Sequence, residues 1–298
     1  MIETFTRHRQ LLFGIAYRML GSVSEAEDAL QEVWLRWQKQ DAAGVRSAKA
    51  WLVSATTRLC IDQLRSARRQ RDEYYGIWLP EPLMISPDKS PDLAAEVGDS
   101  LTMAFMLMLE SLGPDERAVF LLREIFDYDY AEVAEIVGKS EANCRQIVRR
   151  SKASLQTTPR QSTAPTEQAR QLVELFLEAA STGKVEEVLA LLTEQSAVYS
   201  DGGGKVKAAG RAIVGADRVS RFFLGIWPRG LAGMERQFVP INGGPGLLMS
   251  LKGVVHYAFS FELTGDRVKA VYLICNPDKL RHLTPVPIPQ PRTGPAGP

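Results

Sequence analysis

The stretch "DYAEVAEIVGKSEANCRQIVRR", Asp129 to Arg150, decides how the middle of this chain folds. Its first half carries apolar and aromatic side chains at the i, i+3, i+4, i+7 spacing of one helical face: Tyr130, Val133, Ala134 and Val137. Gly138 supplies a turn, and Ser140 can cap a second helix whose inner face holds Cys144, Ile147 and Val148. Two helices joined by a short turn that contains glycine are typical of a helix-turn-helix unit.

The outer face of this second helix is basic and rich in amides. It carries Asn143, Arg145, Gln146, Arg149, Arg150 and Lys152. Such side chains bond phosphates and base edges, so the pattern predicts a nucleic-acid surface whose arginines divide between the two kinds of contact. A basic face that only keeps the protein in solution is the alternative.

Three helices are predicted before this unit. The first has apolar residues on one face (Leu12, Ile15, Ala16 and Met19) and ends at Gly21; the second opens at Ser24, with Glu27 completing a capping box. The third runs from Ser47 or Ala48 into an arginine-rich segment. Charge is separated along them, because "SEAEDALQE" (24–32) holds four acids and no base, whereas "RLCIDQLRSARRQR" (58–71) holds five arginines against Asp62. This separation predicts a protein partner at the acidic face and a polyanion at the basic one.

The bulk composition bounds the class of protein. A length of 298 residues predicts two or three domains, and 45% hydrophobic and 24% charged residues with a net charge of +1 are typical of a globular chain. We expect a cytoplasmic protein without a membrane segment, because no apolar run approaches the roughly 18 residues that span a bilayer and no signal peptide is visible. Cys60, Cys144 and Cys275 lie far apart, so we expect buried thiols rather than disulfides or a metal site.

The remaining sequence divides into linkers and a second kind of domain. "YYGIWLPEPLMISPDKSPD" (74–92) carries four prolines and is too apolar to be solvated, so we expect it to dock. After the polar linker "QTTPRQSTAPTEQ" (156–168), helices are expected at 169–180 and 185–192. Strand-like runs follow: "SAVYS", "KVKAAGRAI", "ERQFVPI", "GLLMSL", "VVHYAFSFEL" and "RVKAVYLIC". Helices followed by strands predict an α+β layer arrangement.

Residues 1–155 closely resemble an extracytoplasmic-function (ECF) sigma factor of bacterial RNA polymerase. The resemblance lies in the acidic helix, the arginine-rich helix and "LGPDERAVFLLREIFDYDYAEVAEIVGKSEANCRQIVRRSKASL" (112–155). Three further motifs, "WLPEP" (78–82), "DGGGK" (201–205) and "NPDKL" (276–280), together resemble the group with a SnoaL-like C-terminal extension. The resemblance implies a multidomain chain of two all-α sigma domains and an α+β SnoaL-like domain, a cystatin-like cone. The expected boundaries are 1–75 (region 2), 76–100 (linker), 101–156 (region 4), 157–168 (linker), 169–283 (SnoaL-like domain) and 284–298 (a Pro- and Gly-rich tail).

The resemblance also implies partners. Core RNA polymerase would bind through its β′ coiled coil and its β flap, and the residues that resemble the coiled-coil contact are Asp28, Gln31, Glu32 and Trp37. The arginines that resemble the surface for the −10 promoter element are Arg58, Arg65, Arg68, Arg69 and Arg71, and the helix-turn-helix would read the −35 element. For the acidic helix, a solvated face is the alternative. No cofactor or metal is expected.

The C-terminal part raises the question of catalysis. Relatives of this fold can host a general base, and Asp201, His256, Tyr257, Glu262 and Asp266 are candidates, but their spacing marks no second partner. We therefore expect no enzyme, with a fused small-molecule enzyme or a sensor of an unknown small ligand as alternatives.

The glycine run at 202–204 does not match a phosphate-binding loop, because Val206 follows the lysine. It predicts a turn between strands. Asp201 and Lys205 flank this turn, and we expect them to pair with the linker, Lys205 with Glu81, while Trp78 is buried against the domain. The resemblance implies a regulator in cis, and the interdomain residues it assigns are Trp78, Leu79, Pro80, Glu81, Pro82, Asp201, Gly202, Gly203, Gly204, Lys205, Asn276, Pro277, Asp278, Lys279 and Leu280.

Overall fold

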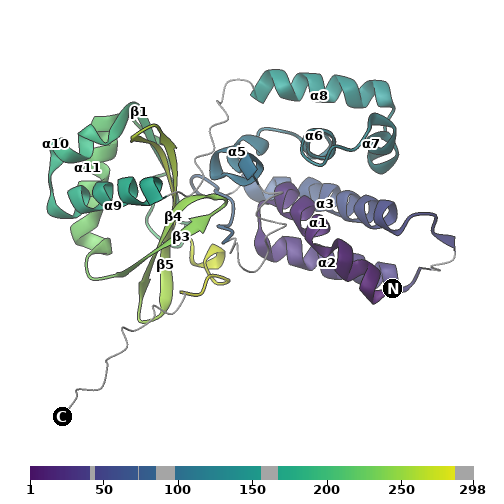
Figure 1. Ribbon diagram of the computed structural model, residues 1–298, viewed down its shortest axis with the longest axis horizontal. Helices are drawn as coiled ribbons and strands as arrows, with labels where there is room; N and C mark the ends of the chain where they lie inside the picture. Colours follow the sequence, from purple (N-terminus) through teal and green to yellow (C-terminus); the bar gives the residue numbers. More distant parts are fainter. Residues whose placement is uncertain (41–43, 73, 85–97, 156–166, 286–298) are drawn as a thin grey trace, which may run out of the picture.

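The computed structural model describes residues 1–40, 44–72, 74–84, 98–155 and 167–285, with only the backbone for 67–72, 98–99 and 229–230. A helical half is followed by an α+β half (Figure 1). The helical half contains α1 (Ile2–Leu20), α2 (Val23–Gln38), α3 (Ala48–Asp72), the 3-10 turn η2 (Gly98–Leu101), α5 (Met103–Leu109), α6 (Pro114–Glu124), α7 (Tyr130–Val137) and α8 (Glu141–Leu155). Within the described residues, no helix is long and apolar enough to cross a membrane.

The first helices begin and end largely where the sequence predicts. Gly21 ends α1 with a φ of 70°, a left-handed conformation that glycine adopts without steric cost. The cap of α2 is Ser22 and not the predicted Ser24, because Ser22 takes the extended backbone of an N-cap and its Oγ accepts the Glu25 N–H (3.1 Å). α3 begins at Ala48, as expected.

The predicted helix-turn-helix is confirmed as α7 and α8. Asp129 caps α7, Gly138 ends it with a φ of 69°, and the Ser140 hydroxyl accepts the Asn143 N–H (3.3 Å) at the start of α8. The predicted inner face of α8 is buried. One continuous apolar core joins these helices to α1–α3, so the two helical domains pack directly on each other.

The α+β half is built on one six-stranded sheet in the order β2-β1-β6-β5-β4-β3. Its elements are α9 (Glu167–Thr182), α10 (Val185–Ala190), β1 (Leu192–Asp201), β2 (Ile213–Val214), α11 (Ala216–Ile226), the π-turn η3 (Trp227–Leu231), β3 (Glu235–Ile241), β4 (Gly244–Leu251), β5 (Val254–Thr264), β6 (Arg267–Ile274) and the 3-10 turn η4 (Pro277–Lys279). The β1–β6 pair is parallel and the other pairs are antiparallel. The predicted α+β class of this half is confirmed.

Two expectations for this half are wrong. The run "KVKAAGRAI" (205–213) enters a strand only at its last residue, Ile213, because its earlier backbone groups are used in turns, as when the Val206 N–H donates to the Gly202 carbonyl (3.0 Å). The helix α11 was not predicted at all, although Val219, Phe222 and Phe223 recur at helical spacing.

The two faces of the sheet have different covers. Helices α9, α10 and α11 lie on the face away from the helical half (Figure 1). The opposite face belongs to a separate apolar cluster in which Leu79 of the linker and Met103 of α5 are buried with sheet residues. The predicted docking of the linker is therefore confirmed, and the three cysteines are buried as expected.

Candidate nucleic-acid interface and linker site

The helix α8, on which the basic face is predicted, lies at the outer edge of the helical half (Figure 1). All six residues predicted for the basic face are exposed: Asn143, Arg145, Gln146, Arg149, Arg150 and Lys152. Two of them also have partners within the domain. Arg145 pairs with Glu141 (2.8 Å) and lies 4.8 Å from the centre of the Tyr130 ring, and Lys152 pairs with Glu124 (2.6 Å). This arrangement leaves a polar helix face that can enter a major groove.

The arginines of α3 are differently placed. Arg58 donates from Nε to the Ile136 carbonyl (2.8 Å) and from Nη2 to the Glu135 carbonyl (2.8 Å), at the C-terminal end of α7. Arg65 donates to both carboxylate oxygens of Asp115 (3.1 and 3.0 Å) on α6. The side chains of the other three predicted residues, Arg68, Arg69 and Arg71, lie outside the described part. In this arrangement two predicted −10 contacts face the helix-turn-helix domain.

The acidic helix α2 presents a polar face. Asp28, Gln31 and Glu32 are exposed, and Glu32 pairs with Arg36 (2.9 Å). Trp37, predicted as a polymerase contact, is buried instead: it is 3% exposed, and its ring packs on that of Trp51 with the ring centres 5.1 Å apart. It forms part of the core and is not presented to a partner here.

The fully buried Asp201, at the end of β1, connects the glycine turn to the linker. Its Oδ1 accepts the Tyr74 hydroxyl (2.5 Å) and the Gly203 N–H (3.0 Å). Its Oδ2 accepts the Leu79 N–H (2.9 Å) and the Lys279 ammonium (2.7 Å). The buried charge is thus paired and hydrogen-bonded on both oxygens, as burial requires.

Lys279 closes the same site from the C-terminal side. It is 7% exposed, and its Nζ also donates to the Leu79 carbonyl. The ammonium lies 4.1 Å from the centre of the Trp78 ring and 5.1 Å from that of Tyr74, where a cation is attracted by the ring faces. Asn276 donates to the Tyr74 hydroxyl (2.9 Å).

The glycine turn is confirmed in the loop between β1 and β2. Gly203 has a φ of 59°, and a side chain there would overlap the Asn276 amide. The predicted pairing of Lys205 with Glu81 is wrong, because Lys205 pairs with Asp278. The remaining interdomain residues divide by exposure: Pro80, Pro82, Gly202 and Leu280 are buried, while Gly204 and Pro277 are exposed.

Glu81 instead caps α2 from outside that helix. Its carboxylate accepts the Val23 N–H (2.7 Å), the Ser24 N–H (3.2 Å) and the Ser22 hydroxyl (2.8 Å). Free N–H groups and the helix dipole attract a carboxylate to this end, which is why the linker acid lies here and not at the glycine loop. Trp78 packs beside it, since a Cβ added at Gly21 would lie 2.5 Å from Trp78 Cη2.

A second interdomain contact was missed by the sequence analysis. Asn242, at the β3–β4 turn, is fully buried and has a φ of 52°. Its Nδ2 donates to the Tyr17 hydroxyl (2.7 Å) and to the Leu101 carbonyl (3.0 Å), and its Oδ1 accepts the Leu83 N–H (2.9 Å). The Tyr17 hydroxyl in turn donates to the Glu81 carbonyl (2.6 Å). The dipeptide Asn-Gly signals a hairpin turn, but it does not signal these partners.

The two buried tyrosines at these contacts stay protonated at neutral pH. Burial raises the pKa of Tyr17 well above its ordinary value. Burial, followed by the hydrogen bond to Asp201, raises the pKa of Tyr74 in the same way. Both hydroxyls therefore remain hydrogen-bond donors.

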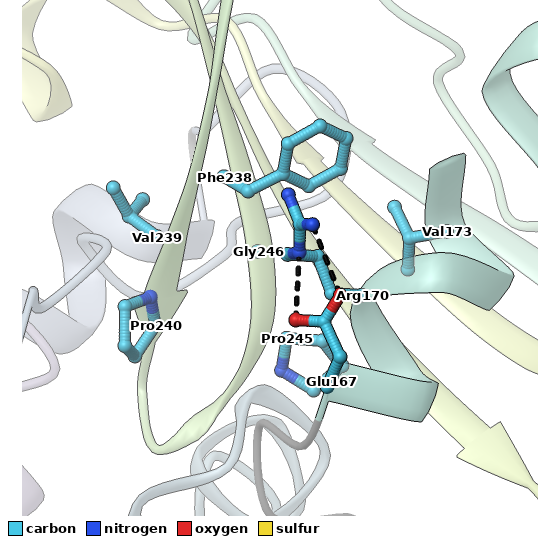
Figure 2. A pocket seen from close by; sticks show the side chains of 8 residues that line it. All are labelled: Glu167, Arg170, Val173, Phe238, Val239, Pro240, Pro245 and Gly246. Carbon is cyan, nitrogen blue, oxygen red and sulfur yellow. Dashed lines mark hydrogen bonds and ion pairs between the residues drawn. The ribbon is translucent and has the colours of Figure 1, made fainter. Parts of the chain in front are cut away.

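The interior between the α+β helices and the sheet is filled with aromatic rings. Phe176, Phe223 and Phe259 are fully buried, and the first two lie 4.9 Å apart edge to face. A hollow of about 190 Å³ remains at its rim, between α9 and the β3–β4 hairpin. Figure 2 shows Arg170 in it, between Phe238 and Glu167, and the guanidinium is paired with both Glu167 and Glu174.

The five catalytic candidates have different surroundings. Asp201 is engaged by the linker, and Glu262 pairs with Lys269 (2.6 Å) and accepts the Tyr272 hydroxyl (3.1 Å). Asp266 is exposed at the β5–β6 turn. His256 and Tyr257 line an open groove of about 430 Å³. The described geometry does not bring these five side chains to one centre.

The fold and the two helical surfaces define a DNA-binding protein of the sigma-70 class. The Sigma-70 region 2 model matches residues 4–70, and the Sigma-70 region 4 model matches residues 102–155. Over 308 aligned residues, the chain is 36% identical to the ECF RNA polymerase sigma factor SigJ of Mycobacterium tuberculosis, covering 99% of this chain and 97% of the relative. It is also 29% identical to the probable ECF sigma factor SigI of that organism, over 92% of each chain. The crystal structure of SigJ is similar, with a TM-score of 0.75 at 32% identity, over 94% of this chain and 98% of that one.

The chain therefore belongs to the ECF RNA polymerase sigma factors. As such it binds core RNA polymerase and directs it to promoter DNA, and it carries a fused C-terminal α+β domain.

Proposed function

We propose that the C-terminal domain restrains this sigma factor in cis, by holding the linker so that α3 stays packed against the helix-turn-helix domain. The single observation that carries the proposal is the use of Arg58 and Arg65 in contacts with α7 and α6. In this arrangement the N–H groups that Arg58 and Arg65 donate to protein carbonyls and to a carboxylate are not offered to DNA phosphates. Separation of regions 2 and 4 then frees the −10 surface.

The linker joins these two regions and is held from three sides. Asp201 and Lys279 hold Leu79, Asn242 holds Leu83, and Tyr17 of region 2 holds the Glu81 carbonyl. If region 4 moves away from region 2, it pulls on the linker. Separation of the two regions therefore requires that the C-terminal domain release the linker.

The surfaces for the polymerase and the promoter are part of the same proposal. The exposed acids and amide of α2 would meet the β′ coiled coil, region 4 would meet the β flap, and the outer face of α8 would read the −35 element. α2 keeps its face open in the closed arrangement, so polymerase can dock there before the linker opens.

The test is transcription in vitro with purified core polymerase. The variant Asp201→Ala removes a buried partner of Lys279 and should increase promoter-dependent transcription, while Asp266→Ala, an exposed turn acid, is the matched control. Deletion beyond Leu155 should act in the same direction. Equal activity of the full-length chain, Asp201→Ala and the deletion would refute restraint in cis.

The promoter surface is tested separately by DNA binding. Replacing Arg149 and Arg150 by Ala should lower the slope of the salt dependence of −35 binding by about 0.9 for each phosphate that these arginines neutralise. Arg221→Ala, an exposed arginine of α11, is the control. An unchanged slope would contradict the assignment of α8.

A small-molecule enzyme or sensor is not proposed, because no observation favours it. The aromatic filling of the domain interior and the two carboxylates on Arg170 argue against a ligand there.

A further inference from the structure

The C-terminal domain contacts the main-chain N–H and carbonyl groups of the linker. At Leu79 both main-chain groups are bound, the N–H by Asp201 (2.9 Å) and the carbonyl by Lys279. At Leu83 the N–H donates to the Asn242 side chain (2.9 Å) and the carbonyl accepts the Asn242 N–H (2.8 Å). Three of these bonds are made by side chains of the C-terminal domain, and the fourth, from the Asn242 N–H, is main-chain pairing of the kind by which a sheet edge accepts an extended peptide.

Two further contacts complete this site. The Nε2 of His282 donates to the Pro82 carbonyl (2.8 Å), and Met84 forms an isolated antiparallel bridge with Ile241 of the edge strand β3. The contacts from Leu79 to Met84 thus follow one continuous segment of the linker.

One linker side chain, that of Leu79, is a fully buried member of the apolar cluster on the sheet. The same cluster contains Ile241, Leu248 and Ile274 of the sheet. Trp78 lies over the Lys279 ammonium, as described above. The C-terminal domain therefore recognises the linker side chains mainly at an aromatic residue followed by leucine.

Glu81 is read by a different partner. Its N–H donates to the Gly21 carbonyl (2.8 Å), and its carboxylate caps α2, so both groups face region 2. Region 2 thus provides the hydrogen bonds to Glu81, whereas the C-terminal domain reaches that carboxylate through His282, whose Nδ1 lies 4.0 Å from Oε2.

The prolines fit the segment for this role. Pro80 and Pro82 have no N–H to satisfy, and they hold the chain extended, which lowers the entropy cost of binding. The N–H groups of Leu79, Glu81 and Leu83 are all paired.

We propose that this site is a peptide receptor, which also accepts in trans an extended segment of a partner protein with the pattern aromatic, Leu, Pro, any residue, Pro, apolar. A partner peptide that displaces the linker would release the sigma factor, a role that rests on the proposed function. A tethered ligand competes at an effective concentration of the order of millimolar, so the closed chain excludes weak peptides.

The experiment uses the full chain and a fluorescent peptide of residues 74–84, YYGIWLPEPLM. Leu79→Asp in the chain places a charge in the apolar pocket and empties the site, and the milder Leu79→Ala serves if the first variant is unfolded by circular dichroism. Fluorescence anisotropy measures the dissociation constant, and we expect saturable binding that is weaker in the unmodified chain.

Two altered peptides distinguish the site from the region 2 surface. A peptide carrying Leu79→Ala should bind about 10- to 100-fold more weakly, because it lacks a buried leucine. A peptide carrying Glu81→Ala should bind within about twofold, because that side chain faces region 2. Absence of saturable binding to a folded variant, or equal losses of affinity for the two peptides, would overturn the receptor.

The outcome is separable from that of the proposed function. If the peptides fail to bind while Asp201→Ala still raises transcription, the proposed restraint in cis is supported and the proposed peptide receptor is refuted. If the peptide binds as expected but Asp201→Ala and the deletion leave transcription unchanged, the receptor site stands and its regulatory role falls.

Discussion

Replacing Asn242 by glycine should loosen the linker far beyond the substituted residue. Glycine keeps the positive φ of 52° without strain, so the change isolates the side chain. That side chain makes three buried hydrogen bonds, to Leu83, Tyr17 and Leu101. At about 1 kcal/mol for each bond, the closed arrangement loses about 3 kcal/mol. Since 1.4 kcal/mol corresponds to a factor of ten, the opening equilibrium should rise roughly 100-fold.

Native-state hydrogen exchange measures this opening at single amides. The Leu79 N–H is the reporter, because it is bound by Asp201 and does not touch Asn242. If the linker opens as one unit, its exchange in the variant should accelerate by roughly the same 100-fold. Tyr17→Phe should accelerate it less, and the two changes together should be less than additive because they share a hydrogen bond.

A matched control exists in the neighbouring hairpin. Lys252 also has a φ of 52° and precedes a glycine, but it is exposed at the β4–β5 turn, so Lys252→Gly should leave the Leu79 amide unchanged. Acceleration confined to the Leu83 amide in Asn242→Gly, with Leu79 unaffected, would refute the idea that the linker opens as a unit.

Three further outcomes follow from the same contacts. Gly203→Ala should lower the midpoint of thermal unfolding much more than Gly265→Ala. Both glycines have nearly the same φ (59° and 58°), but only a Cβ at Gly203 would overlap a side-chain amide, that of Asn276. Equal shifts of the midpoint would contradict the close packing of the turn. Hydrogen bonding to Lys205 lowers the pKa of Asp278, so the stability from this pair is present above the ordinary carboxyl value and is lost as pH falls through the lowered pKa. In Lys205→Ala, an NMR titration should show the Asp278 pKa moving upward, and an unmoved value would exclude the pair in solution. Burial raises the pKa of Cys275 to about 12, so its thiol should resist alkylation at pH 8 until the chain unfolds, as mass spectrometry can follow.

Local patterns in the sequence were sufficient for the helical half. The spacing of Val133 and Val137, and the glycine between the two helices, predict the helix-turn-helix because a helix face and a left-handed turn each depend on a few adjacent residues. The apolar, proline-rich linker was predicted to dock for a similar reason. In the α+β half, the helix α11 was not predicted, because the runs of sequence on both sides of it are strand-like.

The partners of the buried polar groups could not be predicted in this way. Glu81 was expected at Lys205 and lies at the start of α2, and Arg58 was expected at DNA and lies at the end of α7. For Asn242, the sequence indicates only a turn.

By itself the sequence determined the helix-turn-helix, the docking of the linker and the α+β half, and it carries motifs that resemble those of ECF sigma factors, because motifs and periodicity are properties of short segments. Only the tertiary structure decided that the linker is held between region 2 and the C-terminal sheet, by Tyr17 and Asn242 as well as by Asp201 and Lys279. The physical reason is that a buried donor or acceptor must be satisfied by whatever group folding brings within about 3 Å of it, and that group can lie more than a hundred residues away.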